Sequence, residues 1–330
     1  IMIEAPWSWR GGVRKHAEPA PELAGYRNLI DHLSGRRVVD EFPVGDGGVA
    51  YILEGEGDDS IIAWRDYDAG TPTVISAYLA AGPVTLVDIF GNRTELAADG
   101  GLHRIELRDE PVFIEGVNVN LARFRAGFAI EPNFVPSTAS SHELALLLKN
   151  PWPGAVTGRL RIVEPADWKI SPRLQSFSIP GDGMVSLPFE AVFGVGEEAG
   201  PAKFSVEFEL SADRNYPHMA LSSQVEIGLP TVQITPTYRI ERDSSGDWND
   251  LTVNILVTNI SERPITVQVF AMAPGFPRQQ APVSDLPPNE SVVKRFRFVG
   301  GGKSLRGDSV RVGLIENDGF GRLNKSLEIQ

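Results

Sequence analysis

The sequence predicts an all-β protein, built from three tandem immunoglobulin-like β-sandwich domains with one α-helix near the N-terminus. Apolar residues recur at every second position through most of the chain, as in strands that bury one face. Glycine (33 residues) and proline (25 residues) are numerous, which is typical of proteins rich in turns. The length of 330 residues is enough for two or three domains.

The composition narrows the classes of function. A net charge of -12 argues against nucleic acid and anionic membrane surfaces as partners. The chain has no cysteine, which excludes disulfides, thiol nucleophiles and thiolate metal sites. No apolar run approaches the roughly 20 residues of a membrane span. Because a cysteine-free chain fits an exported bacterial protein, we expect a secreted, periplasmic or cell-surface location. The start Ile1-Met2 suggests a fragment without its upstream part.

The first predicted domain covers residues 1–116 and contains the helix. Leu23, Tyr26, Ile30 and Leu33 form one apolar stripe at helical spacing, which predicts a helix over 21–33. Gly35 suits the position just past its end, and His32 is expected at the edge or surface. Trp7 and Trp9 are assigned to packing rather than to a ligand. We predict strands at 38–42, 49–53, 60–64 and 73–79, followed by a β-meander over 83–116.

Motifs in residues 20–116 resemble the end of a (β/α)8-barrel glycoside hydrolase. In that family a last helix ends in a turn like LSGRR, here Leu33 to Arg37, and the β-sandwich beside the barrel has an Ala-Trp strand, here Ala63-Trp64. A DIFGN turn, here Asp88 to Asn92, and a closing PVFIEG strand, here Pro111 to Gly116, complete the match. The family's two catalytic carboxylates lie on barrel strands, and such a barrel takes about 250 residues that this sequence does not contain. The resemblance therefore implies an upstream catalytic barrel in the same polypeptide, not glycosidase activity here.

The second and third predicted domains cover residues 117–229 and 230–330. Residues 117–133 are interpreted as a connector. The NPWPG turn (150–154) and the PADWKISP crossover (165–172) resemble those of immunoglobulin-like sandwiches attached to bacterial α-galactosidases, and the last domain resembles a fibronectin-type or cell-adhesion module. The strands predicted here are 142–149, 158–163, 185–193, 203–210, 231–234, 251–259, 265–271, 292–298, 309–315 and 326–329.

The sequence contains no convincing catalytic constellation. It lacks the nucleophile-elbow, phosphate-loop and zinc-protease motifs, and its five histidines are scattered. The best candidate for a calcium or sugar site is the group of Asp243, Asp247 and Asp250 around Trp248. A solvated hairpin tip explains the same group. No other cofactor is indicated.

Three tryptophans lie in or beside turns, where an aromatic ring could stack on a sugar. They are Trp152, Trp168 and Trp248, and each is also a plausible packing residue. We expect at most one of them to contact sugar, and Trp248 is the first choice because its neighbours are polar.

Three functional hypotheses follow. The first is a non-catalytic accessory region, acting as scaffold or spacer behind a glycosidase barrel. The second is an autonomous carbohydrate-binding protein that uses exposed turn tryptophans, with a polysaccharide as partner. The third is an enzyme whose site lies at a domain junction.

Overall fold

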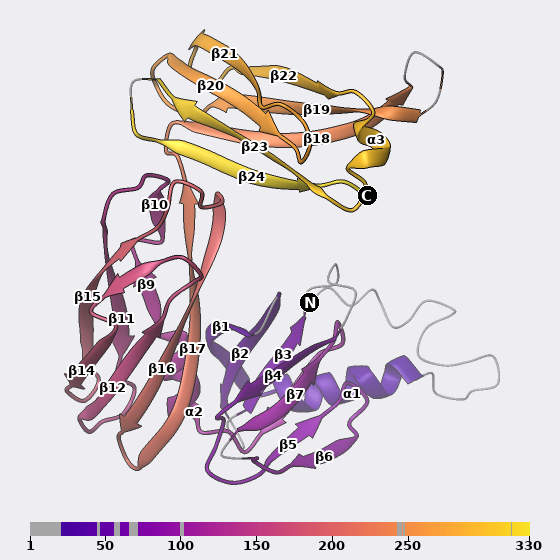
Figure 1. The fold of residues 1–330 in the computed structure, drawn as a ribbon. Coiled ribbons are helices and arrows are strands. Elements are labelled where there is room, and N and C mark those ends of the chain that lie inside the picture. Colours follow the sequence, from indigo (N-terminus) through magenta and orange to yellow (C-terminus); the bar gives the residue numbers. More distant parts are fainter. Residues whose placement is uncertain are drawn as a thin grey trace, which may run out of the picture.

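The computed structural model describes residues 21–44, 47–55, 60–65, 72–99, 102–242, 246, 248–317 and 319–330. Within them the chain is all-β with an N-terminal helix, as predicted. We call residues 21–116 the first region, 129–228 the second region and 232–330 the third region. Figure 1 shows the second region between the other two: the third lies across its upper end and the first against its lower part. Trp7 and Trp9 lie outside the described residues.

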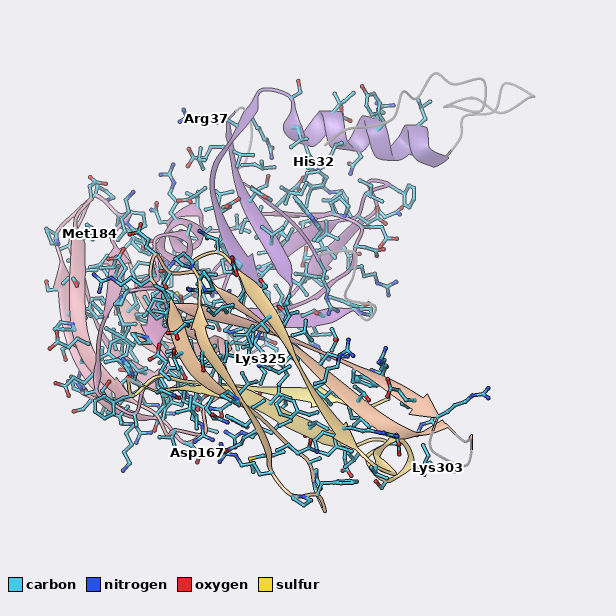
Figure 2. The ribbon with its side chains drawn as sticks, turned by 90° about the horizontal axis from the view of Figure 1, so that it is seen from above. His32, Arg37, Asp167, Met184, Lys303 and Lys325 are labelled. Atoms are coloured by element: carbon cyan, nitrogen blue, oxygen red, sulfur yellow. The ribbon has the colours of Figure 1, made fainter. Side chains whose placement is uncertain are left out.

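Helix α1 (Pro21–Leu33) has the predicted bounds. Gly35 follows it with a φ of 72°, which suits glycine after a helix. His32 is buried, contrary to the expected edge or surface position (Figure 2). Its ring stacks on Phe113 at 4.0 Å and its Nε2 lies 3.1 Å from Glu115 Oε1, so a fixed partner compensates its burial.

The first region pairs its strands as a six-stranded sheet, in the order β1-β2-β3-β8-β5-β6, and a two-stranded sheet, β4-β7. The predicted meander over 83–116 is therefore wrong in its middle. β5 turns back into β6, whereas β7 leaves to pair with β4, and β8 returns between β5 and β3. The strands are β1 (Arg36–Val44), β2 (Gly48–Gly55), β3 (Ser60–Arg65), β4 (Thr73–Ala77), β5 (Val84–Val87), β6 (Arg93–Leu96), β7 (His103–Leu107) and β8 (Val112–Glu115).

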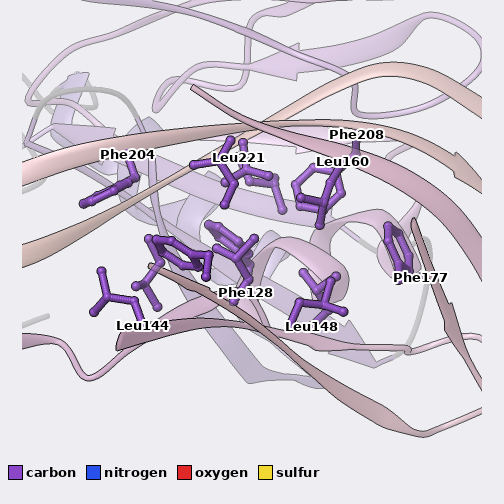
Figure 3. Packing of buried hydrophobic residues seen from close by; sticks show 14 of the residues in the cluster. Phe128, Leu144, Leu148, Leu160, Phe177, Phe204, Phe208 and Leu221 are labelled. Carbon is purple, nitrogen blue, oxygen red and sulfur yellow. The ribbon is translucent and has the colours of Figure 1, made fainter. Parts of the chain in front are cut away.

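The second region is a sandwich of a five-stranded sheet, β10-β17-β16-β12-β14, and a four-stranded sheet, β13-β15-β11-β9. Side chains from the two sheets meet in one core, and Figure 3 shows Phe204 and Phe208 of β16 in the layer facing Leu144 and Leu148 of β11. Its strands are β9 (Ala129–Glu131), β10 (Phe134–Pro136), β11 (His142–Lys149), β12 (Val156–Val163), β13 (Lys169–Ser171), β14 (Leu174–Ile179), β15 (Met184–Val192), β16 (Gly200–Ser211) and β17 (Asn215–Gly228).

The third region packs a three-stranded sheet, β18-β19-β22, against a four-stranded sheet, β21-β20-β23-β24. Its core is separate and includes Val253, Val269, Phe298 and Leu314. Its elements are β18 (Val232–Arg242), β19 (Trp248–Asn259), β20 (Ile265–Met272), β21 (Gln279–Leu286), β22 (Ser291–Phe298), α3 (Gly301–Ser304), β23 (Ser309–Glu316) and β24 (Arg322–Glu328).

Helix α2 (Val119–Ala126) joins the first two regions, so the predicted connector over 117–133 contains a helix that the sequence does not predict. Its buried residues, Leu121, Ala122 and Phe124, face cores on two sides, so they do not form the single apolar stripe by which a helix is recognised in a sequence. Among the described residues, no helix has the length and apolar character needed to cross a membrane.

Candidate functional site

Trp152 and Trp168 are core residues, which corrects their assignment as candidate sugar-binding rings. They are 3% and 4% exposed. The Trp152 ring lies 6.0 Å from both Phe124 and Tyr216, and the Trp168 ring lies 4.5 Å from Phe193. A ring enclosed in this way has no free face to stack on a pyranose.

The acidic group around Trp248 is only partly described. The backbone of Trp248 opens β19 opposite Arg242, while the side chain of Trp248, together with Asp243 and Asp247, lies outside the described part. Asp250 is 1% exposed, and its carboxylate accepts from Arg297 Nε at 3.0 Å and from the backbone N–H of Gly300 at 2.8 Å. Both oxygens are committed to protein donors, so Asp250 is a structural ion-pair residue rather than a free cation ligand. Across the described residues, no three histidine, aspartate or glutamate side chains gather to hold a metal ion.

A hollow of about 630 Å³, lined by both charged and apolar residues, lies on the outer face of the five-stranded sheet of the second region. Arg159 and Arg161 of β12 stand opposite Glu209 and Glu207 of β16. Arg161 Nε lies 3.0 Å from Glu207 Oε2. The alternation is visible in the sequence, since arginines at 159 and 161 and glutamates at 207 and 209 alternate with apolar residues. The strand register that places the arginines opposite the glutamates cannot be read from the sequence.

Asn118 is the centre of the junction between the first and second regions. Its backbone N–H donates to Leu79 O of the first region at 2.8 Å, and its Oδ1 caps α2 by accepting from the N–H groups of Asn120 and Leu121. Its Nδ2 donates to Tyr216 Oη of the second region at 3.0 Å. Through its backbone N–H and its side chain, this one residue therefore links the first region, the helix and the second region.

Tyr216 extends this link into the second region. Its hydroxyl donates to Asp213 Oδ1 at 2.6 Å. Burial, reinforced by the hydrogen bond to Asp213 and the charge of that carboxylate, raises the pKa of Tyr216. The phenol therefore stays protonated and keeps both hydrogen bonds well above neutral pH.

Aromatic packing gives the same junction a shared core. Tyr78 of the first region meets Tyr216 edge to face at 5.6 Å and belongs to the buried cluster of the second region. Phe124 of α2 packs edge to face on Phe208 at 5.8 Å. Because apolar area from the first region and from α2 is buried in the core of the second, separating them would expose that area to water.

Two arginines of α2 hold the helix from its two sides. Arg123 forms an ion pair with Glu54 of β2. Arg125 donates to Tyr78 O of the first region and to Ala220 O of the second, each at 3.4 Å. Burial lowers the pKa of Arg125 to about 10, which leaves the guanidinium charged at neutral pH.

Asn324 is the centre of the junction between the second and third regions. The turn over 194–200, between β15 and β16, lies against β24. Asn324 is 1% exposed, and its Nδ2 donates to Val195 O at 3.1 Å and to Glu197 O at 2.9 Å. Its backbone O accepts from the N–H of Ala199 at 2.8 Å. These bonds fix β24 to the turn, and Ala199 of the turn also packs against the core of the third region.

Further polar contacts surround Asn324. Arg311 Nη2 donates to Gly196 O at 2.5 Å, and the N–H of Arg322 donates to Ser137 O at 3.0 Å. Thr231, in the short link between the regions, donates to Glu316 Oε1 at 2.9 Å. The second junction is therefore a polar clamp.

No family model and no curated protein matches the chain. Similar solved structures include a protein of unknown function from Porphyromonas gingivalis W83, with 12% identity over 61% of this chain and 99% of that one and a TM-score of 0.26. The Pseudomonas aeruginosa CupB2 chaperone is similar at 14% identity over 56% of this chain and 92% of that one, with a TM-score of 0.19. SSP-19, an MSP-domain protein-like family member of Caenorhabditis elegans, is similar at 10% identity over 30% of this chain and 98% of that one, with a TM-score of 0.21. At these scores none of them supports an argument about function.

Proposed function

We propose that this chain is a rigid, non-catalytic spacer that holds its three β-sandwich regions in one fixed arrangement. The observation that supports it is the construction of the two junctions. Domains in one chain move relative to each other by default unless their interface is large and hydrophobic. The first junction has a shared apolar core, whereas the second relies on hydrogen bonds to buried Asn324. Here Asn118 and Asn324 each bond neighbouring regions through both backbone and side chain.

We also propose that this spacer belongs to a longer polypeptide that contains a glycoside hydrolase barrel. The ordered motifs of residues 20–116, from the Leu33–Arg37 turn to the Pro111–Gly116 strand, resemble those that follow a catalytic barrel. A spacer in that position would set the distance between the barrel and whatever follows it, in a secreted, periplasmic or cell-surface protein.

Small-angle X-ray scattering tests the rigidity. We expect the scattering of the described regions to fit the single arrangement of Figure 1 and to stay the same from low to high salt. A curve that needs a broad ensemble of region orientations would contradict the proposal. A panel of aryl glycosides tests the non-catalytic part: cleavage that one carboxylate variant abolishes would show an enzyme instead.

Weak carbohydrate binding is a second candidate function. The observation in its favour is the hollow lined by Arg159, Arg161, Glu207 and Glu209, whose charged groups could bond sugar hydroxyls. Without an aromatic platform we expect millimolar affinity. An NMR titration of soluble oligosaccharides against the wild type, Arg161→Ala and Trp248→Ala decides between sites. Loss of the shifts in Arg161→Ala alone places binding in the hollow, loss in Trp248→Ala alone places it at the hairpin, and no shifts in the wild type leave the spacer role.

A further inference from the structure

Three arginines gather on the outer face of the four-stranded sheet of the third region. Arg278 precedes β21, Arg311 lies on β23 and Arg322 on β24, and we call them the arginine cluster. The Cζ atoms of Arg278 and Arg322 lie 4.6 Å and 5.2 Å from the centroid of the Phe270 ring. Arg311 stands on the neighbouring strand, opposite Met272 of β20.

Phe270 is the platform that brings the cluster together. It pairs with Gly313 on β23, and a Cβ on Gly313 would come within 2.7 Å of the ring. The missing side chain lets the ring lie across the strand, where guanidinium groups can stack on its face. The ring of Phe270 is completely buried, whereas Arg278 is exposed and Arg322 is partly exposed.

The cluster has no acidic partner among the described residues. None of its guanidinium groups comes within 4.0 Å of a described carboxylate, although many arginines elsewhere in the chain form ion pairs. Glu198 is near but accepts from Ser326 Oγ. The bonds of the cluster go to neutral oxygens of Gly196, Asn324 and, with its amide turned toward Arg278, Gln280, at 2.5, 3.1 and 2.8 Å.

The three positive charges of the arginine cluster repel one another, and burial disfavours the charged form of Arg322. Burial, followed by the charges of Arg311 and Arg278, lowers the pKa of Arg322. Three like charges are held together on a chain whose net charge is -12. A planar guanidinium has five N–H donors, so the neutral bonds leave several donors for a ligand.

We propose that the arginine cluster is an oxyanion site that binds a sulfate or phosphate group, free or carried as an ester on a larger molecule. Guanidinium groups bind such oxygens through paired, charge-assisted hydrogen bonds, and a dianion would offset the mutual repulsion of the three cations. The site lies beside the clamp at Asn324, because Arg311 and Arg322 contact both the cluster and the junction. This inference is independent of the spacer proposal.

The test is a calorimetric titration of the wild type with sodium sulfate and with sodium phosphate, against sodium chloride at matched ionic strength. We expect saturable binding of sulfate or phosphate, at least tenfold weaker binding in Arg278→Gln/Arg322→Gln, and unchanged binding in Arg295→Gln. Arg295 is an exposed arginine on the other sheet of the region and serves as the matched control. Equal responses in the wild type and the double variant, or a response to chloride of the same size, would overturn the proposal.

Two further measurements distinguish a free anion from an ester ligand and do not depend on the variant being folded. A sulfated disaccharide that binds more tightly than inorganic sulfate, with no binding of its unsulfated form, indicates an ester ligand, whereas equal affinity indicates the free ion. The NMR signals of the guanidinium Nε–H groups in the wild type should shift for Arg278 and Arg322 and not for Arg295. Shifts spread evenly over all arginines would contradict a site.

Discussion

The two junctions of this molecule join similar sandwiches by different physics. Between the first and second regions, α2 and Tyr78 bring apolar side chains into a core that both share. Between the second and third regions, a turn and a strand are fixed by hydrogen bonds around Asn324. The two buried cores stay separate clusters, and among the described side chains only Ala199 of the turn reaches from the second region to the core of the third. Both can fix an orientation, but only the first makes the folding of one region depend on the other.

This difference implies different responses to damage. Loss of apolar contact in a shared core costs the transfer energy and leaves a cavity, so both regions lose stability. Loss of a polar clamp costs its hydrogen bonds and frees the orientation, while each core remains intact. Variants at the two junctions therefore distinguish a loss of stability within the regions from a loss of their fixed relative orientation.

The largest effect is expected for Phe124→Ala at the first junction. The ring is fully buried against Phe208 and Trp152, so its removal should lower the free energy of unfolding by about 3–5 kcal/mol. Denaturant unfolding should show the first and second regions losing stability together. Phe320→Ala is the control, because that ring is 94% exposed. Equal effects of the two variants would refute the shared core.

A smaller effect is expected for Asn324→Ala at the second junction. It removes the two bonds to Val195 O and Glu197 O and leaves these carbonyls without that donor, a cost of about 1–3 kcal/mol. Calorimetry should show the transition of the third region separating from the rest. Asn317→Ala, at an exposed position of the same region, should leave the thermogram unchanged. A uniform fall of every transition would mean that this junction is also a shared core.

The smallest effect is the pH dependence of Tyr216→Phe. The pKa of Tyr216 is raised above its ordinary value of 10.0. Above pH 10 the unfolded chain releases this proton before the folded one, so the stabilisation is complete below pH 10 and falls as pH rises, by at most about 1.4 kcal/mol per pH unit. The stability difference between the wild type and Tyr216→Phe, measured by denaturant unfolding, should therefore be larger at pH 8 than at pH 11. An equal stability difference at pH 8 and pH 11 would show that the ionisation of Tyr216 is not linked to folding.

The fold could be predicted where local patterns decide it. The apolar stripe and Gly35 identify α1 with its bounds, and two-residue alternation identifies most core strands. Helix α2 is not predicted because its buried residues face two cores and leave no single apolar stripe. The meander is predicted wrongly because two-residue alternation identifies a strand but not the strand with which it pairs.

The candidate site could be predicted less well, because it depends on contacts between distant residues. A turn position does not say which way a ring points, so the sequence leaves Trp152 and Trp168 open as either sugar-contact candidates or packing residues, and the structure shows both buried. Asp250 meets Arg297, 47 residues away, and Asn324 meets Val195, 129 residues away. No spacing rule in a sequence gives such pairs.

Distance measurements between spin labels test the central claim, a fixed arrangement of three regions, most directly. The chain has no native cysteine, so Phe90→Cys and Val299→Cys, at side chains 53% and 70% exposed in the first and third regions, can be labelled without background. Pulsed electron resonance should give one narrow distance distribution in the otherwise wild-type chain, broadened when Asn324→Ala is added. A broad or multiple distribution without Asn324→Ala would contradict the rigid spacer.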